Sequence, residues 1–335
     1  FSYIDPVANI SEEKWVNSIN NFVNAKSHKV TFNSNDIIED FDDLLKTQGE
    51  PFAGPSIYAQ YRVFKTMKEN NVRVSLDGQG ADEIFGGYNG YPGYRMHSLL
   101  DKNNFVEMLY FLNAWSKYTN HSRVEGIKRL IDSITTGKLN QFLRNINNNF
   151  KTMRYIDKES LCKYSINPFL QVDEVKVENH GRKMVSFIRE SLTKTGLQSL
   201  LRHGDRNSMR FSVESRVPFL TKDLANLTLS LPENCLVSNE GQPKSIFRDA
   251  MKEIVPEEIL SRRDKIGFEV SGEKILFSLK EKIYDWFNQD LNIPFLKLNV
   301  VKKEFEMYFL GKRKYSHDLW RIINFYRWYL LHFDE

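Results

Sequence analysis

The chain has 335 residues, of which 41% are hydrophobic and 27% are charged, and its formal net charge is +4. These proportions are close to the averages for globular proteins and exclude a disordered chain, a collagen-like chain and a membrane-helix bundle. The balanced charge gives no support for a nucleic-acid partner, and no run reaches the ~18 apolar residues that a membrane-spanning helix needs.

The first 90 residues alternate between strand patterns and helix patterns. Apolar, β-branched and aromatic residues form three short strand candidates, and apolar residues at helical spacing lie between them. This alternation predicts a parallel sheet with helices on its faces, with any ligand beyond the carboxyl ends of the strands. The expected strands are 1–4, 28–32 and 72–76, and the expected helices are 12–26, 35–46 and 56–70.

Beyond residue 95 the strand patterns become rare and helical periodicity dominates. The clearest helices are expected at 104–116, 182–195 and 316–333, and 151–179 reads as an irregular, extended connection. Within the last helix, the aromatic run Trp320–Leu331 predicts a core helix. At roughly 150 residues per domain the length predicts about two domains, which we refine to one α/β domain, with a sheet part over 1–95 and a mainly helical part over 96–335.

The strand at 72–76 runs into a glycine-rich segment, LDGQGADEIFGGY, at Leu76–Tyr88. Glycines permit close backbone approach and left-handed conformations, so exposed amides can form an anion-binding nest, and Asp82 and Glu83 can hold Mg²⁺ against phosphate. The alternative is a tight strand-to-helix connection in which the carboxylates cap the helix. The spacing matches neither of the two standard phosphate-binding motifs.

This segment resembles the synthetase-domain signature of the glutamine-dependent asparagine synthetase family. Three further segments agree with the family in the same order, so the resemblance covers most of the chain. These segments are GEPFAGPS (Gly49–Ser56), LRHGDRNSMRFSVESRVPFL (Leu201–Leu220) and PKSIFRDAMKEIVPEEILSRRDKIGF (Pro243–Phe268).

The resemblance implies an adenine-nucleotide α-hydrolase-like fold, also called the PP-loop ATPase fold. It further implies an ATP-dependent ligase in asparagine biosynthesis. In that reaction the aspartate β-carboxylate attacks ATP to give β-aspartyl-AMP and pyrophosphate, and ammonia from glutamine then displaces AMP. ATP and Mg²⁺ are the implied cofactors.

The family roles transfer to individual positions of the glycine-rich segment. Asp82 would hold Mg²⁺ on the pyrophosphate, which lowers the charge of the leaving group. The backbone at Asp77, Gly78 and Gly80 would border the ATP, and Tyr3 would lie on the adenine side. At Asp77 the family often carries serine, and a carboxylate near phosphates is favourable only when it faces the ribose or the metal.

Gln79 stands where well-known family members carry glutamate, a residue tied to the acyl-adenylate. A glutamine can donate and accept hydrogen bonds but cannot act as a general base. The change weakens the assignment of aspartate as substrate more than the assignment of adenylation, and Gln79 keeps its place among the implied catalytic residues.

Three basic residues in the later segments complete the implied catalytic set. Lys265, in RRDKIGF, would stabilise the α-phosphate and pyrophosphate as a point charge. Arg206 and Arg216 are each able to clamp a carboxylate or phosphate bidentately. The alternative for Arg216 is a simple pairing with Glu214. His28, in the second expected strand, is assigned a structural role.

The family's phosphate loop, an SGG-D-S type run after the first strand, is not found in the sequence, and neither is a glutaminase domain. The chain starts with Phe1 rather than Met. We therefore expect a C-terminal fragment of a longer enzyme, inactive by itself in ATP–pyrophosphate exchange.

Several questions stay open at this level. The substrate is aspartate or, in an amidotransferase of the same fold, another carboxylate such as a surface sugar or secondary metabolite; a third alternative is a non-catalytic remnant. The expected partners are the carboxylate, ammonia from glutamine and the missing glutaminase domain, and a homodimer is one option for assembly. The widely spaced Cys162 and Cys235 form no metal-binding or disulfide pattern and fit a cytoplasmic protein.

Overall fold

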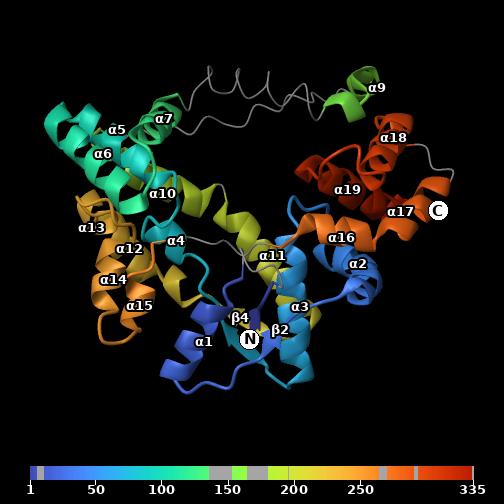
Figure 1. The fold of residues 1–335 in the computed structure, drawn as a ribbon, viewed down its shortest axis with the longest axis horizontal. Coiled ribbons are helices and arrows are strands. Elements are labelled where there is room, and N and C mark those ends of the chain that lie inside the picture. Colours follow the sequence, from blue (N-terminus) through green and yellow to red (C-terminus); the bar gives the residue numbers. More distant parts are fainter. Residues whose placement is uncertain are drawn as a thin grey trace.

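The protein is described by a computed structural model that covers residues 1–5, 11–135, 153–163, 180–194, 196–263, 270–289 and 293–333. Helices dominate, and the few strands are short and lie near the N-terminus (Figure 1). One helical group lies on the left of Figure 1, a second lies on the right, and α11 (Leu197–Arg210) runs between them.

The strands form two parallel pairs. β1 (Ser2–Tyr3) pairs with β2 (Lys29–Val30), and β3 (Val74–Leu76) pairs with β4 (Glu214–Arg216). The three predicted strands are present, and β1 and β2 run parallel as expected. In the described part of the chain β3 does not join them but pairs with β4 in a separate two-stranded sheet, which corrects the prediction of one sheet. β4 was not predicted, because Glu-Ser-Arg lacks the β-branched and aromatic residues that favour strands.

Three helices follow the expected order in the N-terminal part: α1 (Glu13–Phe22), α2 (Ser34–Gln48) and α3 (Ser56–Glu69). A capping box of Asn33 and Asp36 begins α2, and Gly49 ends it with φ +69°, because glycine tolerates the left-handed conformation of a helix C-terminus. α1 is shorter than predicted. Its apolar stripe is not buried, and Phe22 is 54% exposed.

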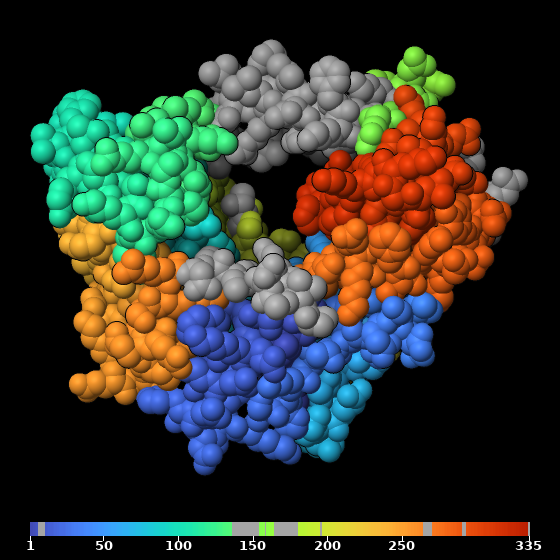
Figure 2. Space-filling view, in the orientation of Figure 1, coloured from blue at the N-terminus to red at the C-terminus, as the bar shows by residue number. Residues whose placement is uncertain are grey.

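The larger hydrophobic core joins α2 and α3 to the C-terminal helices. Trp320 and Tyr326 of the last helix are fully buried there, which confirms the predicted core helix. Figure 2 shows the blue N-terminal and orange-red C-terminal segments side by side, and α2 contacts both α16 and α19. The C-terminal helices are α16 (Gly272–Ser278), α17 (Lys280–Asn288), α18 (Leu298–Phe309) and α19 (His317–Phe333).

A second core lies in the other helical group, around Tyr91, Met96 and Met184. A third, smaller cluster packs α4 (Ala81–Ile84) against the segment after β4. The helices of this side are α5 (Tyr91–Asp101), α6 (Phe105–Thr119), α7 (Arg123–Ile134), α10 (Lys183–Thr193), η2 (Pro218–Leu220), α12 (Lys222–Ser230), α13 (Glu233–Leu236), α14 (Ser245–Ala250) and α15 (Glu257–Leu260).

The predicted extended connection at 151–179 is described only at 153–163, where η1 (Met153–Tyr155) and α9 (Lys158–Lys163) form helical turns instead. The position chosen to separate the two parts, residue 95, falls within α5, and β4 of the later part completes the sheet of β3. Within the described ranges, none of the helices is long and apolar enough to span a membrane.

Candidate functional site

The glycine-rich loop leaves β3 at the carboxyl end of the β3–β4 pair. The Asp77 amide donates to the Arg216 carbonyl at 2.7 Å, which extends the ladder by one residue. The Asp77 carboxylate then accepts a hydrogen bond from the Gln79 amide at 3.2 Å and so closes the turn. Burial raises the pKa of Asp77, although the amides of Gln79 and Gly78 oppose that shift.

Gly80 is the backbone hinge between this turn and α4. It adopts φ +92°, and a Cβ atom here would overlap the side chain of Leu220. Glycine satisfies both demands because it has no side chain and readily adopts positive φ. Gly78, in contrast, is exposed and has open space around it, so its backbone is accessible to a ligand.

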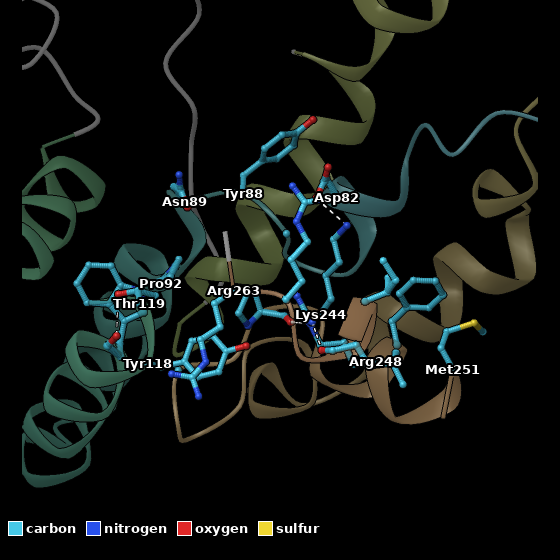
Figure 3. Close-up of a pocket in the computed structure, with 18 of the residues that line it drawn as sticks. Asp82, Tyr88, Asn89, Pro92, Tyr118, Thr119, Lys244, Arg248, Met251 and Arg263 are labelled. Atoms are coloured by element: carbon cyan, nitrogen blue, oxygen red, sulfur yellow. Dashed lines mark hydrogen bonds and ion pairs between the residues drawn. The ribbon is translucent and has the colours of Figure 1, made fainter. Parts of the chain in front are cut away.

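In the first turn of α4, Asp82 forms an ion pair with Lys244: the Oδ1 and Nζ atoms lie 2.8 Å apart (Figure 3). Both side chains are about a quarter exposed, at 29% and 26%. Lys244 is the residue before α14 and has φ +56°, an uncommon conformation for a residue with a side chain. Such strained residues occur often at functional sites, where the surrounding structure holds them in place.

Gly87 allows this pair to form. A Cβ atom at Gly87 would overlap the Asp82 carboxylate and the Cε atom of Lys244. One residue after Gly87, the Tyr88 hydroxyl donates to the buried Glu83 carboxylate at 2.7 Å. Burial, followed by the Glu83 hydrogen bond, raises the pKa of Tyr88 and keeps its hydroxyl protonated.

The pair lies at the wall of a cavity of about 740 Å³ between the loop after α4, the end of α6 and residues 241–263. Four basic residues line it, and Asp82 is the single carboxylate among the described lining residues. Arg248 connects the two ends of the 243–260 segment by donating to the carbonyls of Pro243 and Leu260. The basic residues are Lys244, Arg248, Arg262 and Arg263.

The other predicted site residues are spread over the molecule. Tyr3 is buried in the larger core, stacks on Phe32 and donates to Asp5 at 2.7 Å. Burial and the nearby Asp5 carboxylate raise the pKa of Tyr3. Gln79 faces α11 near Gly204, and its buried Oε1 has no hydrogen-bond partner among the described residues. Lys265 lies outside the described residues.

The two predicted arginines contact protein groups. Arg206 lies against the C-terminal end of α2, where its Nη1 is 3.5 Å from the Thr47 carbonyl oxygen. Arg216 is exposed and pairs with Glu214 at 2.8 Å, which confirms the simple pairing considered above. The structure thus brings Asp77, Gly78, Gly80 and Asp82 together in one loop, with the backbone of Arg216 beside them.

Lys244 was missed at the level of the sequence, although it lies in the segment that begins at Pro243. The sequence feature that could have indicated it is the position of this lysine in PKSIFR, directly after a proline and at the start of a helix. A lysine in such a position is usually a surface residue, and only the folded chain shows that it reaches Asp82.

The carboxylates available at this site show whether it could hold Mg²⁺. Mg²⁺ is usually held by one or two carboxylates together with substrate phosphates. Across the described ranges, no group of three or more histidine, cysteine, aspartate or glutamate side chains converges, and Asp82 offers one carboxylate. This donor set fits an ion that arrives with a phosphate chain and does not fit a resident ion held by protein groups alone.

Together these features define a helix-rich α/β protein whose candidate site follows the carboxyl end of a parallel strand pair. The asparagine synthase family model matches residues 4–330, and the chain belongs to that family. It is 26% identical over 310 residues to asparagine synthetase [glutamine-hydrolyzing] 1 of Bacillus subtilis (strain 168). The aligned residues cover 89% of this chain and 45% of that protein.

A second relative is asparagine synthetase [glutamine-hydrolyzing] 3 of the same organism. It is 25% identical over 253 residues, which cover 74% of this chain and 35% of that protein. The chain therefore spans less than half the length of the curated relatives that it matches.

Proposed function

We propose that the chain forms the synthetase part of an ATP-dependent amide-forming ligase. A carboxylate oxygen of the substrate attacks the α-phosphorus of ATP, and pyrophosphate leaves. Ammonia then attacks the acyl carbon of the acyl-adenylate, loses a proton and expels AMP. Aspartate is the first substrate to test, because both relatives are named asparagine synthetases.

The observation that carries this proposal is the Asp82–Lys244 pair beside the glycine-rich loop. A bound phosphate chain would replace the carboxylate as the partner of the Lys244 ammonium, because phosphate oxygens carry more charge. Asp82 would then be a ligand for Mg²⁺, which supplies charge neutralisation on the leaving pyrophosphate. Separation of this ion pair costs little, because both groups are partly exposed.

The remaining residues have supporting roles in the proposal. Asp77, Gly78 and Gly80 border the nucleotide through their backbone, and Tyr3 supports the adenine side from β1. Gln79 orients the carboxylate or the acyl group by donating from its Nε2. Its Oε1, which has no hydrogen-bond partner among the described residues, can accept from an N–H group of ammonia.

The proposal also includes three basic residues. Lys265 acts on the phosphates. Arg206 and Arg216 contact Thr47 and Glu214 through one nitrogen each, and their other guanidinium N–H groups can bind a ligand.

Ammonia in this proposal comes from glutamine, hydrolysed by a separate glutaminase domain. The PP-loop fold, the phosphate loop and the cytoplasmic location belong to the same proposal. Among the described strands, β1 and β3 each have one hydrogen-bonded neighbour, so each leaves one edge on which a further strand can pair.

The test is substrate-dependent pyrophosphate release by the protein as the cell makes it, first with aspartate and ammonium. We expect release that depends on ATP, carboxylate and Mg²⁺, and that is lost in Asp82→Ala. The 335-residue chain by itself is the matched control, which we expect to be inactive in ATP–pyrophosphate exchange. Pyrophosphate release that is unchanged by Asp82→Ala contradicts the proposal.

A further inference from the structure

A chain of polar side chains crosses the contact of α11 with α2 and α3. It runs from His203 on α11 to Gln60 on α3, through two amide side chains that are fully buried. The His203 Nδ1 lies 2.7 Å from the Gln48 Oε1. The Gln48 Nε2 donates to the Asn207 Oδ1 at 2.7 Å, and the Asn207 Nδ2 donates to the Gln60 Oε1 at 3.1 Å. Each side chain is thus linked to the next by one hydrogen bond.

Two backbone carbonyls fix the direction of this chain, because a carbonyl oxygen can only accept a hydrogen bond. The Gln48 Nε2 also donates to the His203 carbonyl at 3.3 Å, and the Asn207 Nδ2 also donates to the Ile57 carbonyl at 3.1 Å. A reversed amide would place its oxygen against that carbonyl, and two acceptors repel each other. Gln60 must therefore present its Oε1 to Asn207, which leaves the Gln60 Nε2 at the far end of the chain.

This last nitrogen faces the same place as the side-chain nitrogen of Gln79. Gly204 of α11 has no side chain, and the position that its Cβ atom would occupy lies 3.4 Å from the Gln60 Nε2 and 3.9 Å from the Gln79 Nε2. Among the described residues neither nitrogen has an acceptor, and both glutamine side chains are partly exposed. Two amide donors therefore lie together over Gly204, beside the loop that leads to Asp82.

We propose that Gln60 is a second amide donor to the acyl group of the substrate, next to Gln79. This inference rests on the proposed ligase function and adds a residue to it. One oxygen of the substrate carboxylate attacks phosphorus and later leaves with AMP, while the other stays on the acyl carbon as its carbonyl oxygen. When ammonia adds to that carbon, an electron pair moves onto the carbonyl oxygen. The nitrogen loses a proton to solvent, and the pair returns as the bond to AMP breaks.

The two amides are suited to this second step because charge develops there. The carbonyl oxygen of an acyl-adenylate carries no net charge, whereas the oxygen of the tetrahedral intermediate carries a full negative charge. Donors that face this oxygen therefore bind the transition state of ammonia attack more strongly than the adenylate. Such donors are most effective when they are oriented in advance, and the bond from Asn207 to the Gln60 Oε1 supplies that orientation.

The experiment measures the two steps separately in the protein as the cell makes it. ATP–pyrophosphate exchange at saturating aspartate reports adenylation, and amide formation from ammonium reports the second step. In Gln60→Met, which keeps the length of the side chain without a donor, amide formation should fall about 100-fold and maximal exchange should change by less than about threefold. Gln60→Glu, which replaces the donor by an acceptor, should show the same pattern. Gln289→Glu is the matched control at an exposed glutamine and should change neither rate.

Gly204→Ala tests the same place without removing a donor. Gly204 lies inside α11, where alanine favours the helix, so the urea midpoint should not fall. The new Cβ would come within 4 Å of both amide nitrogens and would occupy the space in which they meet the ligand. Amide formation should therefore fall about tenfold, with exchange again little changed.

Amide formation that is unchanged in either Gln60 variant, or that falls in parallel with exchange, would overturn the inference. Exchange in the unchanged protein would still support the ligase function in that case. If the unchanged protein catalysed neither exchange nor amide formation with aspartate, the ligase function on aspartate and this inference would fail together. If the Gln60 variants do not fold, Gly204→Ala decides, and normal amide formation in that variant would overturn the inference.

Discussion

Two groups of basic side chains in this molecule have opposite surroundings. On α11, Arg202, Arg206 and Arg210 follow one another at a spacing of four residues and all reach α2. Arg210 binds Asp43 through two nitrogens at 2.9–3.0 Å, and Arg202 pairs with Glu50 and donates to the Gln48 carbonyl. Around the cavity, by contrast, the four basic residues have one carboxylate among the described lining residues, Asp82, and Arg262 also pairs with Glu12.

The difference separates cations that hold the fold from cations that can bind a ligand. The arginines on α11 meet carboxylates and the free carbonyls at the C-terminal end of α2, where positive charge is favourable. Around the cavity, Lys244 pairs with Asp82 and Arg262 pairs with Glu12. Arg248 and Arg263 have no carboxylate partner among the described residues. Within the proposed function, local charge balance therefore favours the basic residues of the cavity over the arginines of α11 as contacts for a ligand.

The largest expected effect concerns Lys244. In the protein as the cell makes it, Lys244→Ala should lower substrate-dependent pyrophosphate release about 100-fold or more, the usual loss when one preorganised donor to a developing charge is removed. The free energy of unfolding should change by about 1 kcal/mol or less, because the ion pair is partly exposed. Denaturation by urea measures the second quantity, and a drop of several kcal/mol would instead place Lys244 among the groups that hold the fold.

A change at Gly87 tests the pair without removing either charge. In Gly87→Ala the new Cβ would displace the Asp82 carboxylate and Lys244, so pyrophosphate release should fall about tenfold, as expected when reacting groups are shifted slightly. Gly90→Ala is the matched control, because its Cβ meets no atom within 4 Å. Equal activities in the two alanine variants would show that the geometry of the pair is unimportant.

A smaller effect, on stability alone, is expected at Arg210. Arg210→Gln removes the two-nitrogen contact with Asp43, whose pKa is lowered by hydrogen bonds from Arg210 and Tyr61 despite partial burial. Because Arg210 is 49% exposed, we expect a loss of about 0.5–1 kcal/mol in urea unfolding, with pyrophosphate release unchanged. A large loss of activity would erase the distinction between the two groups of basic residues.

The smallest effect is a pH dependence at His203 of α11, whose Nδ1 lies 2.7 Å from the Gln48 Oε1. Burial, assisted by the charge of Arg202, lowers the pKa of His203. The unfolded chain therefore takes up the proton first as pH falls below ~6.5, and stability declines between that value and the lower pKa of the folded state.

In His203→Asn this decline should be smaller than in the unchanged protein when urea unfolding is compared at pH 7 and pH 5. His97, whose pKa is also lowered by burial, is present in both proteins and cancels in the comparison. If both proteins lost the same unfolding free energy between pH 7 and pH 5, His203 would be solvated and its pKa not lowered.

Much of the local structure was predictable because it depends on neighbours in the chain. The helical periodicity and capping residues of α2 predict that helix almost to its ends, and the buried run of α19 follows from its aromatic spacing. The strand β3 and the glycine-rich loop that follows it were also predicted from the sequence. The predicted helix at 12–26 was longer than α1, because apolar spacing alone does not show which helix face packs against another element.

The candidate site was predictable only in part. The residues from Asp77 to Asp82 are contiguous, so their proximity was evident from the sequence. Arg206 and Arg216 were chosen for their motifs, and their contacts with Thr47 and Glu214 depend on how α11 and β4 pack.

The sequence by itself determined the longer N-terminal helices, the last helix, the strands β1 to β3 and the glycine-rich loop, because backbone preferences and side-chain periodicity act over a few residues. Only the tertiary structure decided that β3 pairs with β4, that Asp82 meets Lys244 and that a large basic cavity lies beside them. These contacts join segments far apart in the chain. Their formation depends on the packing of whole helices, whose burial offsets the entropy lost in closing the long loops between them.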